Sequence, residues 1–480
     1  MAPYQLPTTS VTTDSFSPFT RNQRRDKTMH PCLEVPEILA LVCAELVDFD
    51  TLESRQKLAR VARTSRLFNR AATDLLWSRL DCIEPLLNAM PEDLWRFEEK
   101  EYNGPSGRKR RKFRVFARYL TEHDLDKLKL RAKRVRKLTI TIRESISESL
   151  KRLSTIQAAI TFPDFPVFTN LRTLEVKAAD DWVKSADKTQ DISYLRILAG
   201  PSLRQLRFDI PLDSPENVSI LTALPRQCKN VTELKLGPAM SSGPFSSVVL
   251  DRALGHWDQL QEIYVETIHS LGHLVTLSHL PRLRTLELEM GLLQDVSASG
   301  PSGGFRSLTR LKVFVLGQDS GTEPLLRLLG HLFHSPLSDL EFYIQSNSRD
   351  DRDLPLILKR LSQVINSKTL ERLSIGVWTQ GMDPAVGLSD DPYHLDALQP
   401  FCNVHALRIW MPRATPLPPL LSLGRAIRGI RSLDLGPEPA VHISPRLDIR
   451  DLVPIARSFP KLKTLALPAL DAPAHTSIRN

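Results

Sequence analysis

The residue types that could form a catalytic or metal-binding site are few and scattered along this chain of 480 residues. Two histidine pairs, His269 with His273 and His331 with His334, have a spacing that could place both rings on one helix face to bind a metal ion. Neither pair has a carboxylate or a thiol directly beside it in the sequence. The glycine-rich phosphate loops, nucleophile motifs and zinc motifs of common enzyme families do not occur. We therefore expect no catalytic residues, no bound metal and no cofactor, and we expect that the protein is not an enzyme.

A six-residue pattern, apolar at its first, fourth and sixth positions, indicates the structure that must position any binding residues. It occurs twelve times within residues 135–467, and successive copies begin on average about 30 residues apart. In the copy LRTLEL, the alternation of a β-strand sends Leu286 and Leu288 to one face of a sheet and Thr285 to the other. The pattern therefore predicts twelve short strands, each with one apolar face.

Between the copies, apolar residues recur with helical spacing, as they do at Leu325 and Leu329. A strand, a helix and a return turn in each repeat predict an α/β fold, a leucine-rich-repeat solenoid with a parallel concave sheet and outer helices. The pattern resembles the ribonuclease-inhibitor-like leucine-rich-repeat proteins. Those proteins place an Asn or Cys after each strand, whereas Leu236 and Leu435 are each followed by Gly-Pro here. We therefore expect this side-chain ladder to be missing and the solenoid to be irregular.

The predicted outward positions of the strands carry acidic, basic and aromatic side chains. Four carboxylates on adjacent copies, Glu262, Glu266, Glu287 and Glu289, concentrate negative charge around Tyr264. Aromatic anchors among charged residues are typical of surfaces that bind a protein or peptide, and a basic segment would complement these carboxylates. A solvated sheet face with alternating charges would show the same pattern. The residues that we expect to bind a target are Glu262, Tyr264, Glu266, Glu287, Glu289, Lys312, Phe314, Tyr343 and Trp410.

The composition, 41% hydrophobic and 25% charged, is that of a globular protein. The first 29 residues contain no apolar signal segment, and no window approaches the roughly 18 uninterrupted apolar residues of a membrane-spanning helix. The five cysteines have no CxxC spacing, which is typical of free thiols in a reducing compartment. We expect a protein of the cytoplasm or the nucleus, without a membrane partner.

The net charge of +9 is concentrated in residues 100–137, where fifteen Lys or Arg face four Asp or Glu. This segment has a local charge of +11, so the rest of the chain carries −2. Its densest part, residues 108–112, is open to three interpretations: a solvated loop, a nuclear-import signal or a nucleic-acid-binding patch. Only Phe113 and Phe116 could stack on bases there, so we do not expect nucleic acid to be a partner.

Residues 30–80 have the pattern of three short helices. The segment VPE opens the first helix, because proline is tolerated in the first turn. Ile38, Leu39 and Val42 then form an apolar stripe with Cys43 and Leu46. About fifty residues bury little core, so such a module gains stability from a partner or a neighbouring domain.

The segments VPEILALVCAEL and LARVARTSRLFNRAATDLLWSRL resemble the F-box, and the following IEPLL and YLTEHD are similar to fungal F-box proteins with C-terminal leucine-rich repeats. In that family the box binds the Skp adaptor of a cullin-based ubiquitin ligase, and the repeats hold the substrate. The resemblance implies that the residues that pack the box or contact the adaptor are Val35, Pro36, Ile38, Leu39, Leu58, Val61, Phe68 and Trp77. An ordinary three-helix cap on the solenoid would have a similar pattern.

The resemblance implies that the chain is a substrate-receptor subunit of a Skp-cullin-F-box ubiquitin ligase, with the Skp adaptor, the cullin scaffold and an unknown protein target as partners. The alternatives are a non-ligase leucine-rich-repeat scaffold and a nucleic-acid-associated protein that acts through the basic segment. The expected organisation is a disordered lead at 1–29, the F-box helical module at 30–80, a basic linking segment at 81–134 with helices and a loop at 103–112, the irregular solenoid at 135–470 and a tail at 471–480.

Overall fold

In a computed structural model of the chain, the structure describes residues 32, 35–46, 51–104, 107–142, 152–156, 158, 167–178, 192–209, 215–237, 252–295, 304–316, 323–333, 335–346, 353–379, 395–410, 417–435 and 449–466. The expected N-terminal lead at 1–29 and the tail at 471–480 lie outside these residues. The chain divides into two compact units, Met1–Leu76 (unit 1) and Trp77–Asn480 (unit 2). None of the described helices is long and apolar enough to cross a membrane.

Unit 1 is built from the helices α1 (Pro36–Glu45), α2 (Leu52–Ala62) and α3 (Arg66–Ser78), the last of which runs two residues past the boundary. Proline stands in the first turn of α1, as the sequence predicted. Thr51 caps α2 by accepting a hydrogen bond from the Ser54 backbone amide at 3.3 Å. The core is small, with partly buried side chains around it. Its buried residues are Cys43, Leu58, Ala62 and Ala72.

Unit 2 contains a parallel sheet of thirteen strands among the described residues, and the strands follow one another in chain order. Twelve of them fall on the twelve copies of the six-residue pattern, and each begins at the third position of its copy. The thirteenth, β1 (Arg79–Leu80), pairs with the first repeat strand and was not predicted. The repeat strands are β4 (Lys137–Ile142), β5 (Thr173–Ala178), β6 (Gln205–Asp209), β7 (Glu233–Leu236), β8 (Glu262–Ser270), β9 (Thr285–Asp295), β10 (Arg310–Leu316), β11 (Asp339–Ser346), β12 (Arg372–Thr379), β13 (Ala406–Trp410), β14 (Ser432–Asp434) and β15 (Thr464–Ala466).

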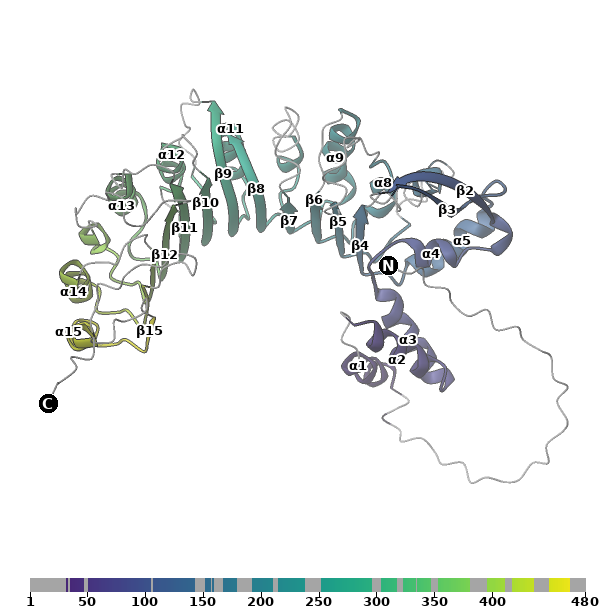
Figure 1. Cartoon of the computed structure of the whole chain (residues 1–480), viewed down its shortest axis with the longest axis horizontal. Helices are drawn as coiled ribbons and strands as arrows, with labels where there is room; N and C mark the ends of the chain where they lie inside the picture. The colour runs from purple at the N-terminus through teal and green to yellow at the C-terminus, as the bar shows by residue number, and fades with distance from the viewer. Residues whose placement is uncertain are drawn as a thin grey trace. The chain divides into compact units, whose positions relative to one another are not determined.

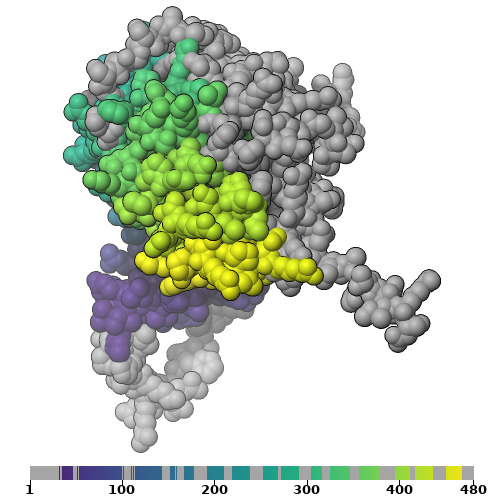
Figure 2. Space-filling view, turned by 90° about the vertical axis from the view of Figure 1, so that its left-hand side faces the viewer, coloured from purple at the N-terminus to yellow at the C-terminus, as the bar shows by residue number. Residues whose placement is uncertain are grey.

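Helices cover one face of this sheet, as Figure 1 shows for α12 to α15 beside the strands β10 to β15. In Figure 2 the last repeats lie one upon the next in chain order, which is the nearest-neighbour stacking of a solenoid. The helices of unit 2 are α4 (Glu84–Asn88), α5 (Glu122–Ala132), α8 (Leu195–Leu198), α9 (Pro215–Gln227), α11 (Leu271–Ser278), α12 (Glu323–His331), α13 (Asp353–Val364), α14 (Leu417–Ala426) and α15 (Leu452–Ser458), with single helical turns η2 (Glu92–Leu94), η4 (Leu395–Leu398) and η5 (Ile449–Asp451).

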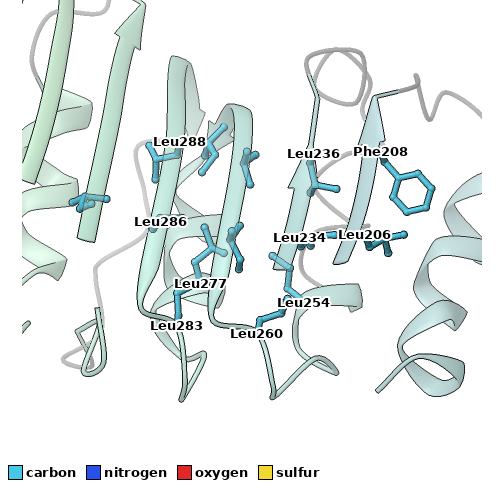
Figure 3. Packing of buried hydrophobic residues seen from close by; sticks show 14 of the residues in the cluster. Leu206, Phe208, Leu234, Leu236, Leu254, Leu260, Leu277, Leu283, Leu286 and Leu288 are labelled. Atoms are coloured by element: carbon cyan, nitrogen blue, oxygen red, sulfur yellow. The ribbon is translucent and has the colours of Figure 1, made fainter. Parts of the chain in front are cut away.

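The core of unit 2 lies between the sheet and these helices. Leu286 and Leu288 are fully buried there, while Thr285 is half-exposed, so the predicted strand register is confirmed. Figure 3 shows how Leu234 and Leu236 on β7 continue the same rows of side chains. Because the inward positions of every strand join one cluster, each repeat buries its apolar face against its neighbours.

Hydrogen bonds between the residues that immediately precede the strands hold the strand register across repeats of unequal length. The backbone amide at the second position of each copy donates to the carbonyl at the second position of the preceding copy, for example from Arg204 to Arg172 at 2.8 Å. A side chain one residue before the copy adds a second link, as Asn230 does by donating to the Pro201 carbonyl at 2.7 Å. Corresponding side-chain bonds are made by Asn170, Ser202, Ser307 and Asn403. Side chains before the strands thus satisfy turn carbonyls.

The basic segment forms a β-hairpin instead of the loop that we expected at 103–112. Strand β2 (Trp95–Gly104) pairs in antiparallel fashion with β3 (Gly107–Phe116). The physical reason is cross-strand pairing: Arg110 contacts Glu101 at 2.9 Å, and Lys112 contacts Glu99 at 3.4 Å. The acidic strand that precedes the basic one in the sequence therefore makes a strand possible where the charge run alone suggested a loop.

An ion pair between Arg118, which follows the hairpin, and Asp124 holds the first turn of α5 in place. The Arg118 guanidinium donates two hydrogen bonds to the fully buried Asp124 carboxylate, at 2.6 and 3.1 Å, and a third to Asp93 at 2.8 Å. Asp124 also accepts the Thr121 backbone amide, and the Thr121 hydroxyl caps the helix in return. The Arg118 guanidinium holds the pKa of Asp124 well below its usual range.

Candidate functional site

The face of the sheet opposite the core presents three rows of side chains, one from each outward position along the strands. The strand register aligns these positions from strand to strand, except that Glu266 follows Val265, where the pairing of β8 with β9 becomes irregular. The first row contains Lys137, Thr173, Gln205, Glu233, Glu262, Thr285, Arg310, Asp339, Arg372, Ala406, Ser432 and Thr464. The second row contains Thr139, Glu175, Arg207, Lys235, Tyr264, Glu287, Lys312, Glu341, Ser374, Arg408, Asp434 and Ala466. The third row, present where strands are longer, contains Thr141, Lys177, Asp209, Glu266, Glu289, Phe314, Tyr343, Gly376 and Trp410.

All nine residues that the sequence indicated as target-binding lie on this face. They separate into rows that the sequence did not distinguish. Glu262 is in the first row, and Tyr264, Glu287 and Lys312 are in the second. The third row contains the other five residues, Glu266, Glu289, Phe314, Tyr343 and Trp410.

Ion pairs between neighbouring strands neutralise much of the first two rows. Asp339 is nearly buried and lies between two arginines, 2.8 Å from Arg372 and 3.4 Å from Arg310. Arg310 also reaches Glu341 at 3.2 Å. These charges form a network across three strands, so the sheet itself satisfies them.

The same holds for two predicted binding residues, Lys312 and Glu287, which lie 3.0 Å apart. Arg408 and Asp434, which were not among the predicted residues, lie 2.9 Å apart. Glu287 is therefore engaged within the sheet and is a weaker candidate for target contact than its type suggested.

Tyr264 is held by one group on its own strand, β8, and by one group on β7. Its hydroxyl donates to Glu262 at 3.2 Å, and the Lys235 ammonium lies 4.2 Å from the centre of its ring. Burial, followed by the Glu262 charge, raises the pKa of Tyr264 to about 12. The ring is thus fixed in place as a neutral hydrogen-bond donor.

The third row has an aromatic half on β10 to β13. Phe314 stacks on Tyr343 with ring centres 5.1 Å apart, and Tyr343 meets Trp410 at 6.1 Å. Tyr343 and Trp410 come from strands that are not neighbours, and Gly376 lies between them. A Cβ atom at Gly376 would lie 2.5 Å from the Tyr343 ring, so the glycine provides the space that this contact needs.

The other half of the third row is acidic, on β6, β8 and β9. Its members are Asp209, Glu266 and Glu289, and no ion pair involves any of them among the described residues. Burial raises the pKa of each, and further increases come from Asp209 acting on Glu266 and from Glu266 acting on Glu289. Gly237 after β7 repeats the role of Gly376, because a Cβ atom there would overlap the Asp209 carboxylate.

A pocket of about 380 Å³ opens beside this acidic half. Its lining includes Tyr264, Glu266, Glu289 and Phe314, so the acidic and aromatic halves meet in it. The sequence analysis missed Asp209, Gly237 and Gly376. All three stand one residue after the sixth position of their copies, as Glu266 and Glu289 do, so applying the same alternation to every copy would have found them.

In unit 1 the residues expected from the F-box resemblance divide into two groups. Leu39 and Leu58 are buried, and Val61 and Phe68 pack against the same small core. Val35, Pro36 and Ile38 are exposed instead. The predicted stripe of α1 is therefore split between the core and solvent.

Trp77 is not part of the unit 1 core. It belongs to unit 2, where it packs against the core of the repeats, and Arg131 lies over its ring at 6.0 Å. Its position at the end of α3 explains the difference, since the strand β1 starts only two residues later.

His269 and His273 do not form the helical metal site that their spacing suggested, and the second histidine pair lies partly outside the described residues. His269 belongs to strand β8, whereas His273 is a buried residue of helix α11, so the two do not share a helix. His331 ends helix α12, where burial lowers its pKa, and His334 lies outside the described residues. In the described part of the chain there is no cluster of three or more potential metal ligands.

Comparisons with known proteins identify no family for this chain. No protein-family model matches the chain, and no curated protein matches it. Among solved structures, the chain is similar to the crystal structure of the leucine-rich repeat-containing protein LegL7 from Legionella pneumophila, with 14% sequence identity and a TM-score of 0.34. The similarity covers 65% of this chain and 93% of that one. It concerns another leucine-rich-repeat protein, and no function is transferred from it.

Proposed function

We propose that this protein is a substrate-receptor subunit of a Skp-cullin-F-box ubiquitin ligase, acting in the cytoplasm or the nucleus. In this role unit 1 binds the Skp adaptor, and the outward sheet face of unit 2 binds a protein target. The protein itself transfers nothing. It raises the effective concentration of the target near the ligase.

The observation that supports adaptor binding is an uncovered apolar face on helix α1. Leu41 is 66% exposed, and Ile38 and Val42 are 36% and 38% exposed. Val35 and Leu46 extend this face at its two ends. We call these five residues the α1 apolar face.

A surface helix of an ordinary small domain is apolar on the core side and polar on the other. Helix α1 is apolar on both of these sides. Leu39 and Cys43 fill the core side, and the α1 apolar face forms the exposed side. A contiguous exposed apolar patch of this kind marks an interaction site. The resemblance of this segment to the F-box supports the Skp adaptor as the partner.

Target binding is supported by the repeat fold and by the mixture of rings and charges on the outward sheet face. The nucleic-acid alternative has less support, because Glu99 and Glu101 partly neutralise the basic strand β3.

The experiment is co-purification of the Skp adaptor and cullin with the full-length chain and with Leu41→Asp. We expect the variant to fold normally, since the side chain is exposed, and to lose the adaptor because a buried charge at an apolar interface is costly. Leu356→Asp is the matched control, as Leu356 is also an exposed leucine, on α13 of unit 2. It should leave adaptor binding unchanged.

If the wild-type chain recovers neither adaptor nor cullin, or Leu41→Asp recovers them as well as wild type does, the ligase proposal is wrong. A non-ligase scaffold would then be the better description of the protein.

A further inference from the structure

The third row differs from the first and second rows in whether its carboxylates have ion-pair partners. Charges in the first and second rows find partners within the sheet, such as Lys312 with Glu287 and Arg372 with Asp339. The acidic half of the third row has no such ion pairs among the described residues, and its aromatic half offers apolar surface. Most charges of the first two rows therefore have ion-pair partners within the sheet, whereas the three carboxylates of the third row have none in the described part of the chain.

The cations nearest to the acidic half are already engaged. Arg207 lies 3.7 Å from Glu175, and Lys235 lies 3.3 Å from Glu233. Arg207 lowers the pKa of both Asp209 and Glu266 to some extent, yet burial outweighs it and both pKa values stay above their usual range. Arg207 and Lys177 therefore act on these carboxylates only at a distance, and none of the three carboxylates forms an ion pair in the described part of the chain.

The two glycines align the row across strands. Gly237 gives Asp209 room to lean towards Glu266, and Gly376 gives Tyr343 room to reach Trp410. Tyr343 is only 8% exposed, so its role is to hold the half-exposed rings of Phe314 and Trp410 at its two sides. The register joins the two halves directly, since Glu289 on β9 is paired with Phe314 on β10.

We propose that the third row is the binding site for an extended basic and apolar segment of a target protein. Its Lys or Arg side chains meet Asp209, Glu266 and Glu289, and its aliphatic or aromatic side chains pack on Phe314 and Trp410. This inference rests on the part of the proposed function in which the repeats bind a protein target. It adds where on the sheet the target binds, which side chains it carries, and that its bound segment runs across the strands along the third row.

The dimensions fit such a segment. Asp209 and Trp410 are seven strand steps apart, which at about 4.8 Å per step gives a distance of roughly 34 Å. An extended peptide rises about 3.3 Å per residue, so a segment of about ten residues covers the row. Basic residues at one end and apolar residues at the other match its two halves.

A partner with a negative surface is disfavoured on the same grounds. Bringing phosphates or acidic side chains against three carboxylates that lack positive partners would add repulsion in a partly desolvated site. The row therefore selects for basic segments by excluding acidic ones as well as by attracting its ligand.

The test is a selection from a phage-displayed library of random 12-residue peptides on the immobilised full-length chain. We expect the enriched peptides to contain two or more Lys or Arg followed or preceded by aromatic or large aliphatic residues. The double variant Glu266→Lys with Glu289→Lys should no longer enrich them. Glu371→Lys is the matched control, because it makes the same charge change at an exposed residue that lies just before β12 and outside the three rows.

An enriched peptide is then synthesised and its affinity measured by fluorescence polarisation. We expect the Glu266→Lys and Glu289→Lys pair to weaken binding by about tenfold or more, and Trp410→Ala to weaken it by a similar factor. Gly376→Ala should weaken it several-fold without adding any charge, because it displaces the Tyr343 ring.

Failure of the selection, enrichment of acidic or uncharged peptides, or unchanged binding by the charge-reversed pair would each overturn the proposed site. None of these results depends on adaptor binding, which is measured by co-purification. The site can therefore fail while the ligase proposal holds, and loss of adaptor binding alone leaves the selection unaffected.

Discussion

Among the described residues, the core cluster of unit 1 contains four buried side chains, whereas the core of unit 2 continues from Leu80 to Phe459 as one cluster. The difference also appears at their surfaces. Helix α1 of unit 1 leaves leucine and isoleucine side chains exposed, while the outward sheet face of unit 2 pairs most of its charges internally. We expect a small unit with apolar side chains on its surface to gain stability from a partner. A long stack of repeats is stabilised by contacts between its own neighbouring repeats.

The largest effect that would test this comparison is expected in unit 1. Leu58 is fully buried in its small core, and Leu58→Ala should cost about 2–5 kcal/mol, which is comparable with the whole stability of such a module. We expect all three helices of unit 1 to lose protection in hydrogen exchange, while β4 to β15 keep theirs. If only the residues around Leu58 lost protection, unit 1 would be more stable than its core size indicates.

The same kind of cavity in unit 2 should have a local effect. Leu286→Ala should also cost about 2–5 kcal/mol, but the loss of protection should be confined mainly to β8, β9 and β10. Thr285→Ala, on the outward face of the same strand, is the control and should change stability by less than about 0.5 kcal/mol. A larger effect at Thr285 than at Leu286 would mean that the strand register is wrong by one residue.

A smaller and pH-dependent effect is expected at the ion pair of Arg118 with Asp124. Asp124→Asn should cost about 2 kcal/mol near pH 7, less than an isolated buried pair because Arg118 is partly exposed and keeps Asp93. The pKa of Asp124 is lowered in the folded state, so its contribution is complete above the unfolded-state pKa of about 4 and declines as the pH falls below it. Urea unfolding at about pH 7 and about pH 2.5 should show the gap between wild type and variant narrowing in acid. A gap of constant size would show that the lost interaction is not ionic.

Much of unit 2 could be predicted because its signal is repeated. One copy of the six-residue pattern is weak, but twelve copies impose the same alternation, and that alternation correctly put Leu286 inside and Glu287 outside. The hairpin was harder, because the charges of residues 108–112 stabilise a strand only when Glu99 and Glu101 lie opposite them. The stripe of α1 was only partly correct, since apolar spacing cannot tell a core side from an uncovered side when both are apolar.

The sequence by itself determined the order of the strands and their inward and outward faces, because these follow from local periodicity and residue type. Only the tertiary structure decided which charges are neutralised by neighbours and which are not. Glu287 and Glu289 are two residues apart on one strand, yet the first meets Lys312 and the second has no ion pair in the described part of the chain. That distinction depends on side chains that arrive from strands roughly 30 residues away in sequence, and on the space left by Gly237 and Gly376.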